Sequence, residues 1–252
     1  MKDAEVPLPL GLTRVAGRRG AKMRAPENTI VSFRAAKRLG AGWVELDAKL
    51  TRDGVPVVIH DQSLDRTTDG AGRVESVTLK EIGWLDAGKW FAPEFAGEKV
   101  PTLADALKAI AAEGLGVNVE IKPCPGRERE TAEASIEVIR EVWPGTLPPP
   151  IISSFQRASL EAAKKAAPEL PRGLLLETRE IDWRETATRL GCKAIHPKWS
   201  ELTAEWVQEI HKAGYVCVTW TVNDPAAAKR LLGWGVDCII TDAPDLIAPV
   251  VS

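Results

Sequence analysis

Short apolar runs alternate with helical patterns along almost the whole chain, and this alternation restricts the possible folds more than any other feature. The runs that predict strands are residues 13–16, 43–49, 55–60, 116–121, 150–154, 172–176, 193–196, 215–221 and 237–241. Helical spacing separates most of them, at residues 27–39, 103–112, 130–142, 158–167, 183–190, 204–213 and 225–232. Such alternation is typical of parallel βα units. With 252 residues, of which 44% are hydrophobic, the chain is long enough to form one βα barrel.

The run at residues 55–60 lies too close to the preceding strand to run parallel to it. A parallel crossover needs about a dozen residues or more, whereas the two runs are separated by a short segment that contains Arg52, Asp53 and Gly54. They therefore predict a hairpin with its turn at these three residues. Eight parallel strands remain, which predicts an α/β fold of the TIM (βα)8 barrel class. We expect a single catalytic domain over residues 1–252, with a small insertion at residues 51–100 between the second barrel strand and the second helix, over the C-terminal face.

Charge and cysteine usage exclude several classes of protein. The formal net charge is −2, without a long run of one sign, so we expect neither nucleic-acid binding nor a polybasic membrane surface. No stretch approaches the ~20 apolar residues of a membrane span, and residues 1–12 do not resemble a signal peptide. The four cysteines are far apart and form no CxxC pair, which indicates reduced thiols in a cytoplasmic protein.

Three carboxylates are predicted to meet inside the barrel. Glu45 and Asp47 are two residues apart on one predicted strand, so their side chains share a face, and Glu120 lies on the next barrel strand. Active sites of βα barrels lie at the C-terminal ends of the strands. Buried charges among apolar neighbours are costly unless they pair or bind a metal. An all-oxygen site suits a hard cation, so the pattern predicts one Mg²⁺ or Ca²⁺.

Basic and proton-transferring side chains are predicted beside these carboxylates. Arg19 follows the first strand, and Lys122 shares a face with the carboxylate two residues before it. A metal with an arginine and a lysine describes a phosphate clamp. The hairpin returns His60 to the same neighbourhood, where it can transfer a proton, and Trp220 is expected to line the pocket beside the substrate. This combination predicts metal-assisted phosphodiester hydrolysis.

Several motifs occur in an order that resembles one enzyme family. They are Arg19-Gly20, Ala25-Pro26-Glu27-Asn28-Thr29, Glu45-Leu46-Asp47, Thr51-Arg52-Asp53-Gly54, Val58-Ile59-His60-Asp61, Arg66-Thr67-Thr68, Glu120-Ile121-Lys122, Ser153-Ser154-Phe155, Trp220-Thr221-Val222-Asn223 and Ile240-Thr241-Asp242. Together they resemble the signature of glycerophosphodiester phosphodiesterases, over nearly the whole chain. Residues 168–177 and 182–192 are most similar to the cytoplasmic bacterial members.

The resemblance implies a role for each residue of the predicted site. Glu45, Asp47 and Glu120 would be the metal ligands, and Arg19 and Lys122 would contact the phosphate. The implied substrate is a small glycerophosphodiester, which is split into glycerol 3-phosphate and an alcohol such as choline or ethanolamine. Stable membrane association is not expected, since no basic amphipathic helix is apparent.

The resemblance also implies one departure from the family. His60 would be one of two general acid/base histidines, and the other histidine directly precedes the Arg-Gly pair. That position is Arg18 in this chain. Arginine stays protonated at any working pH and cannot shuttle a proton. We therefore expect impaired turnover with phosphate binding intact.

Several alternative interpretations remain open at this point. Glu45 and Asp47 could form structural ion pairs with Lys49 or Arg19, and Lys122 could merely neutralise Glu120. His196, at the end of a later strand, could replace the missing base. The barrel could also bind a phosphodiester or phosphomonoester without turning it over. Two further readings are a related barrel that acts on lipid phosphodiesters and a distinct barrel chemistry such as metal-assisted enolisation.

Overall fold

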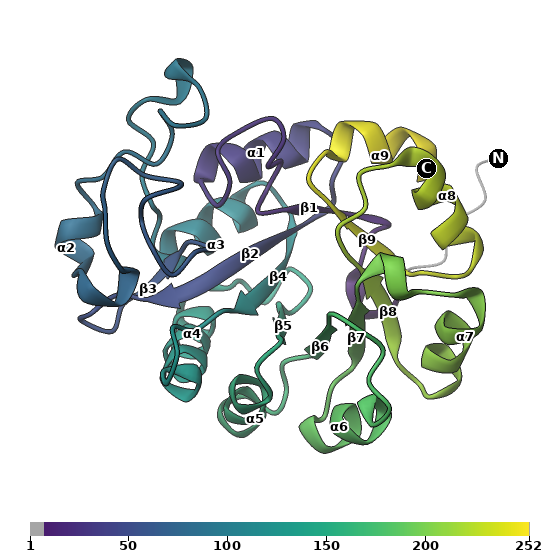
Figure 1. Cartoon of the computed structure of the whole chain (residues 1–252). Helices are drawn as coiled ribbons and strands as arrows, with labels where there is room; N and C mark the ends of the chain where they lie inside the picture. Colours follow the sequence, from purple (N-terminus) through teal and green to yellow (C-terminus); the bar gives the residue numbers. More distant parts are fainter. Residues whose placement is uncertain (1–7, 252) are drawn as a thin grey trace.

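Residues 8–251 are described by the computed structural model, and they form a closed barrel (Figure 1). Its eight parallel strands are β1 (Val15–Arg18), β2 (Trp43–Leu50), β4 (Gly116–Ile121), β5 (Ile151–Ser154), β6 (Arg172–Leu176), β7 (Ala194–Pro197), β8 (Val216–Thr219) and β9 (Cys238–Thr241). Each strand is hydrogen-bonded to the next, and β1 pairs with both β2 and β9, which closes the sheet. The predicted TIM barrel is confirmed, since the extra strand stands outside the closed ring.

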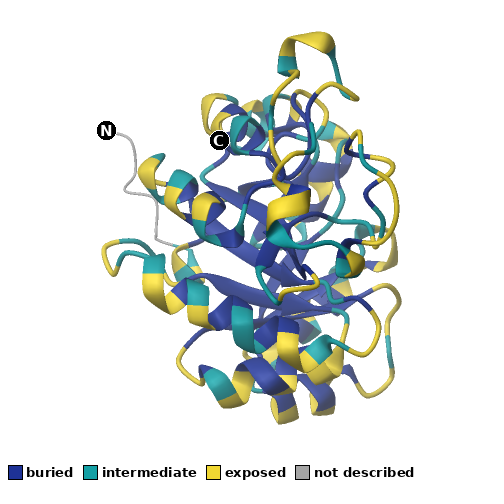
Figure 2. Ribbon diagram, turned by 90° about the vertical axis from the view of Figure 1, so that its left-hand side faces the viewer, coloured by how far each residue is buried: buried dark blue, intermediate teal, exposed yellow. Residues whose placement is uncertain are grey.

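Helices surround the barrel, each with one face buried and the other exposed (Figures 1 and 2). They are α1 (Ile30–Arg38), α3 (Leu103–Ala112), α4 (Glu128–Val142), α5 (Arg157–Ala166), α6 (Trp183–Leu190), α7 (Ala204–Lys212), α8 (Pro225–Gly233) and α9 (Pro244–Val251). The barrel strands are almost entirely buried between these helices and the barrel interior. This double coverage explains why the strands read as continuous apolar runs.

The first helix begins three residues later than the predicted residue 27. Thr29 is its N-cap, with extended backbone angles and a side-chain oxygen that accepts from the Ser32 amide. Glu27 and Asn28 therefore lie outside the helix, where Asn28 reaches Asp47 in the barrel and Glu27 accepts from Arg19. A terminal helix, α9, was not predicted at all, because its sequence is nearly all apolar and contains Pro249.

The predicted hairpin is confirmed. β3 (Pro56–Val58) runs antiparallel to β2, with Ala48 opposite Val58, and the turn contains Gly54 at a φ of 78°. This positive φ is readily adopted only by glycine. The Ile59 amide donates to the Asp47 carbonyl at 3.0 Å, which extends the pairing up to His60. The hairpin thus fixes where the residues that follow β3 emerge relative to β2.

Between β3 and α3 the chain forms short elements instead of a βα unit. These are η2 (Val74–Ser76), α2 (Leu79–Ile82) and η3 (Pro93–Phe95), seen at the left of Figure 1. They have a small core of their own around Val57, Leu64 and Ile82, separate from the main core between barrel and helices. This core attaches the segment to the hairpin.

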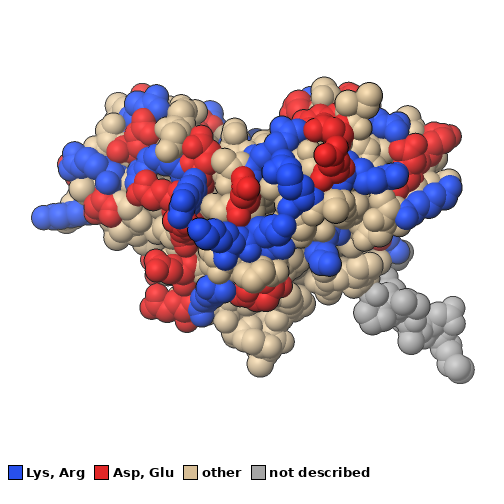
Figure 3. Space-filling model, turned by 90° about the horizontal axis from the view of Figure 1, so that it is seen from below, with Lys and Arg blue, Asp and Glu red and all other residues tan. Residues whose placement is uncertain are grey.

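The surface charges and the length of the helices can be compared with the sequence. Basic and acidic side chains are interspersed on the face shown in Figure 3. Within residues 8–251, no helix combines the length and apolarity needed to cross a membrane. The expectation about a signal peptide concerns residues 1–12, and residues 1–7 of these lie outside the described part of the chain.

Candidate active site

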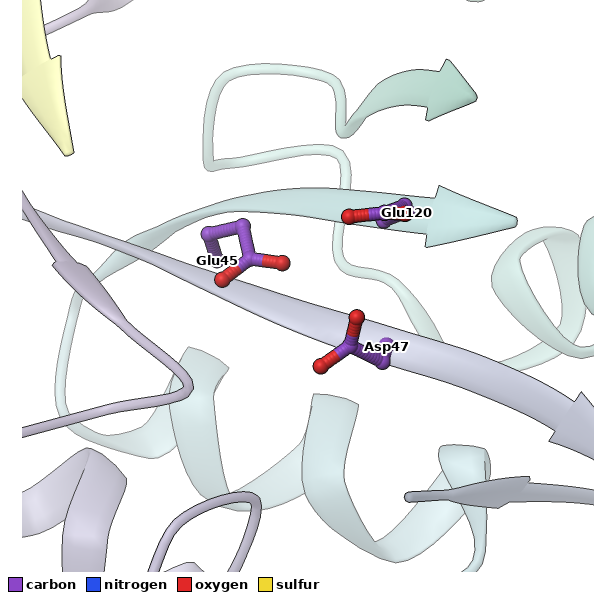
Figure 4. Close-up of side chains that lie close together, drawn as sticks. All are labelled: Glu45, Asp47 and Glu120. Atoms are coloured by element: carbon purple, nitrogen blue, oxygen red, sulfur yellow. The ribbon is translucent and has the colours of Figure 1, made fainter. Parts of the chain in front are cut away.

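Glu45, Asp47 and Glu120 converge inside the barrel, as Figure 4 shows. Asp47 is directly opposite Glu120 in the β2–β4 register, and each of the three offers an oxygen within 4.8 Å of the others. All three side chains are buried. Burial and the charges of Asp47 and Glu120 raise the pKa of Glu45 to about 8. Burial, together with the charge of Asp47, also raises the pKa of Glu120.

Asp47 is the member of the triad that is held ionised. Burial by itself would raise the pKa of this carboxyl, but the charges of Arg19, His60 and Lys122 outweigh it and lower the pKa. Its Oδ1 accepts no hydrogen bond within the described chain, although it is buried. A buried carboxylate oxygen that accepts no hydrogen bond, on a residue beside two further carboxylates, fits a divalent cation, which prefers oxygen ligands. The triad could therefore hold one hard metal ion.

Two residues with left-handed backbone angles support this triad. Arg19 has a φ of 49°, and its amide donates to Glu45 Oε2 at 3.1 Å. Asn28 has a φ of 59°, and its Nδ2 donates to Asp47 Oδ2 at 2.9 Å. Residues other than glycine seldom adopt such angles, and they tend to occur at functional sites. Asn28 belongs to the motif at residues 25–29, but its spacing in the sequence does not predict that it contacts a carboxylate.

The Arg19 side chain is buried among carboxylates. Its Nη1 donates to Glu27 Oε1 at 2.8 Å, and its Nε lies 3.0 Å from Asp47 Oδ2, in an ion pair that is not aligned as a hydrogen bond. Two cavities open beside the triad, of about 200 Å³ and about 370 Å³, and Arg19 lines neither of them. The alternative that Arg19 pairs with a carboxylate is therefore observed for Asp47, whereas a phosphate contact by Arg19 stays a prediction.

The two lysines near the triad behave differently from each other. Lys122 Nζ lies 2.9 Å from Glu120 Oε1 and 3.8 Å from Asp47 Oδ1, and Lys122 lines both cavities. Lys49 is fully buried, and its Nζ donates to the Lys122 carbonyl at 2.6 Å. The ion pairs of the described chain include none between Lys49 and the triad, so the alternative that placed one there is wrong.

His60 follows the hairpin and faces the same cavities. Its Nδ1 lies 2.6 Å from Asp61 Oδ1. Burial, as the largest influence, lowers the pKa of His60 to about 4. An imidazole with one nitrogen held by a carboxylate and the other free is suited to proton transfer. Sequence reasoning placed His60 correctly near Asp47, but it did not identify Asp61 as its partner.

Arg18 ends β1 and faces a cavity of about 200 Å³. Its Nη1 lies 3.4 Å from Asp242 Oδ1, and its side chain is 21% exposed. The structure brings most of the predicted residues around this one cavity, namely Arg18, Glu45, His60, Glu120, Lys122 and Trp220. A second cavity of about 370 Å³ shares His60, Glu120 and Lys122 with it.

His196 lies outside this constellation. It is fully buried in β7, and neither ring nitrogen has a hydrogen-bond partner within the described chain. Burial lowers the pKa of His196 to about 3. It lines neither cavity, so a compensating base at this position finds no support in the geometry.

Known proteins share both this sequence and this fold. Residues 19–246 match the model of the Glycerophosphoryl diester phosphodiesterase family. A glycerophosphodiester phosphodiesterase of Caldanaerobacter subterraneus is 40% identical over 243 residues, which covers 95% of this chain and 98% of that relative. The glycerophosphodiester phosphodiesterase of Bacillus subtilis is 36% identical over 251 residues, covering 92% of this chain and 84% of the relative.

Two solved structures support the same assignment. An Oleispira antarctica phosphodiesterase in complex with the product sn-glycerol-3-phosphate has a TM-score of 0.93 and 39% identity, covering 95% of this chain and 97% of the other. A glycerophosphodiester phosphodiesterase from Agrobacterium tumefaciens has a TM-score of 0.78 and 31% identity, covering 94% and 100% of the two chains. The barrel, the carboxylate triad and these similarities lead to one conclusion: the chain belongs to the glycerophosphoryl diester phosphodiesterase family.

Proposed function

We propose that the protein hydrolyses glycerophosphodiesters to glycerol 3-phosphate and an alcohol in a metal-dependent reaction. The observation that carries this proposal is the buried triad of Glu45, Asp47 and Glu120, with His60 and Lys122 at the same cavity. The product complex of the Oleispira antarctica relative supports the substrate class. A cation held by the triad, Mg²⁺ or Ca²⁺, would polarise the phosphoryl group.

The side chains of the site divide the remaining work. Lys122 would bind a phosphate oxygen, because its ammonium group lines the cavity beside the triad. His60 would transfer a proton at Nε2, since its Nδ1 is engaged by Asp61. Arg19 would assist phosphate binding through its charge, while it holds Asp47 in place. Trp220 packs edge-to-face on Phe155 at 5.4 Å and would line the substrate side of the cavity.

Arg18 would limit the rate of this reaction. By resemblance it stands where the family has its other acid/base histidine, and a guanidinium cannot accept a proton at neutral pH. A proton-transfer group contributes typically ~10²–10⁴-fold to the rate. The alternative function is a phosphate-binding barrel without turnover. It is favoured by the two cationic side chains, Arg18 and Lys122, that line one cavity.

Turnover separates these two functions. Purified protein would be assayed on glycerophosphocholine and glycerophosphoethanolamine with Mg²⁺ or Ca²⁺, by following the release of glycerol 3-phosphate. Arg18→His would be compared with Arg189→His, a control at an exposed position of α6. We expect slow turnover by the protein itself, a rise of at least ~10²-fold in Arg18→His, and no change in the control. Fast turnover by the unchanged protein would refute the role given to Arg18. No turnover by any of them would refute the phosphodiesterase function.

The proposal extends to the domain organisation, the partners and the location of the protein. We propose that residues 1–252 act as one catalytic domain, with residues 51–100 as an insertion that supplies His60 to the site. The substrate would be a small molecule, with neither nucleic acid nor a membrane as a partner. The four cysteines are buried and unbridged, which supports a reducing, cytoplasmic location.

A further inference from the structure

Arg66 lies in the segment after the hairpin and binds two carboxylates from different parts of the chain. Its Nε donates to Asp61 Oδ2 at 2.6 Å, and its Nη2 donates to Asp61 Oδ1 at 3.1 Å. Its Nη1 donates to Glu27 Oε2 at 2.9 Å, and its Nη2 donates to Glu27 Oε1 at 2.7 Å. One guanidinium therefore uses both of its edges on two carboxylates, a geometry that lysine cannot reproduce.

One of these carboxylates, Asp61, contacts the imidazole ring of His60. Asp61 Oδ1 is 2.6 Å from His60 Nδ1, so a neutral imidazole would carry its proton on Nδ1 and leave Nε2 as the acceptor. Both oxygens of Asp61 are engaged by Arg66, which limits the directions in which Asp61 can point. Partners of this kind fix the tautomer and the ring orientation of a functional histidine.

The other carboxylate belongs to the barrel side of the site. Glu27 precedes α1, and its side chain is only 2% exposed. Its Oε1 accepts from Arg19, whose Nε pairs with Asp47 and whose amide donates to Glu45. Arg66 is thus connected through Glu27 and Arg19 to two of the three triad carboxylates.

We infer that Arg66 is a positioning residue that fastens the segment carrying His60 to the barrel and sets the orientation and tautomer of that histidine. Surface ion pairs contribute ~0–1 kcal/mol as a rule, and Arg66 itself is 43% exposed. Arg66 differs from such a pair because it is bidentate on both partners and one of them is buried. Its effect on catalysis rests on the proposed function, whereas its effect on His60 does not.

The test compares Arg66→Met and Arg66→Lys with Arg73→Met. Arg73 is a matched control in the same segment, where it pairs with its near neighbour Glu75 at 2.5 Å. Nitrogen NMR of the imidazole rings reports their tautomers directly, and the chain has only three histidines, His60, His196 and His211. Kinetics on glycerophosphoethanolamine with Mg²⁺, in the Arg18→His background if needed, supply the second readout.

In Arg66→Met, we expect His60 to lose its single Nδ1–H form while the other two histidines keep their signals. We also expect kcat to fall ~10–100-fold, the effect typical of lost outer-shell partners, with KM changed less than ~3-fold. Arg66→Lys should recover only part of both effects, and Arg73→Met should match the unchanged protein.

An unchanged His60 signal in Arg66→Met would overturn the inference. An equal loss of kcat in Arg73→Met would also overturn it, because the effect would then be a general loosening of the segment. If Arg66→Met does not fold, Arg66→Lys decides, since it keeps the charge but lacks the planar fork that makes arginine bidentate on both carboxylates. If no variant turns over substrate, the NMR result still decides the positioning role, and only the proposed function fails.

Discussion

Without a divalent cation, the protein should lose stability as the pH rises through the range in which Glu45 ionises. Burial, with the charges of Asp47 and Glu120, raises the pKa of Glu45 from 4.5 to about 8. Between these values the folded state holds a proton that the unfolded state has lost. The free energy of unfolding therefore falls with rising pH, and this contribution is gone once the pH passes the folded pKa.

The size of this effect follows from the shift. From about pH 6 to about pH 9, the contribution of Glu45 to stability falls by about 3 kcal/mol, at 1.36 kcal/mol per pH unit below the folded pKa. For a chain of this length, that corresponds to a melting temperature lower by about 6–12 °C.

Urea unfolding of EDTA-treated protein at both pH values measures this loss. Glu45→Gln should flatten the decline, and Glu137→Gln, at an exposed position of α4, should leave it unchanged. Added Ca²⁺ or Mg²⁺ should stabilise the protein more at the higher pH, because ligation needs ionised carboxylates. A Glu45→Gln variant with the same decline as the unchanged protein would refute the reasoning.

Three further predictions concern single side chains. Arg19→Met removes the guanidinium that pairs with the buried carboxylates of Glu27 and Asp47, so it should lower the free energy of unfolding by about 3–5 kcal/mol in urea titrations, more than the exposed control Arg189→Met. His196→Met should change kcat/KM less than ~3-fold, since the ring lines neither cavity. A loss of ~10²-fold or more would contradict this and indicate that His196 acts as a catalytic base. Leu107→Ala, in the core face of α3, should cost about 2–5 kcal/mol by the same titration, and a cost below ~1 kcal/mol would contradict its packing role.

Much of the fold could be predicted because local patterns and long-range packing agree. The bounds of α3, α6, β4 and β6 match the prediction, since apolar spacing marks each of these elements. The prediction is wrong for elements whose limits are not marked by apolar spacing. β1 lies two residues later than predicted, because its limits depend on pairing with β2 and β9, and α9 has no polar face to reveal its period.

The sequence also determined which side chains share a face of the barrel. A spacing of two on a strand places Glu45 with Asp47 and Glu120 with Lys122, whatever the loops do. The short connection before β3 required a hairpin, and this brought His60 to Asp47. These relations are local consequences of strand geometry, so they could be worked out without the tertiary structure.

The partner of each charged side chain depends on tertiary contacts. Arg19 is held by Glu27 and Asp47, and Arg66 joins its near neighbour Asp61 to Glu27, which lies 39 residues before Arg66. His196 is fully buried, although its place at the end of a strand suggested a functional position. Such pairings depend on how loops far apart in sequence meet when the barrel closes, and on side-chain directions that residue spacing does not encode.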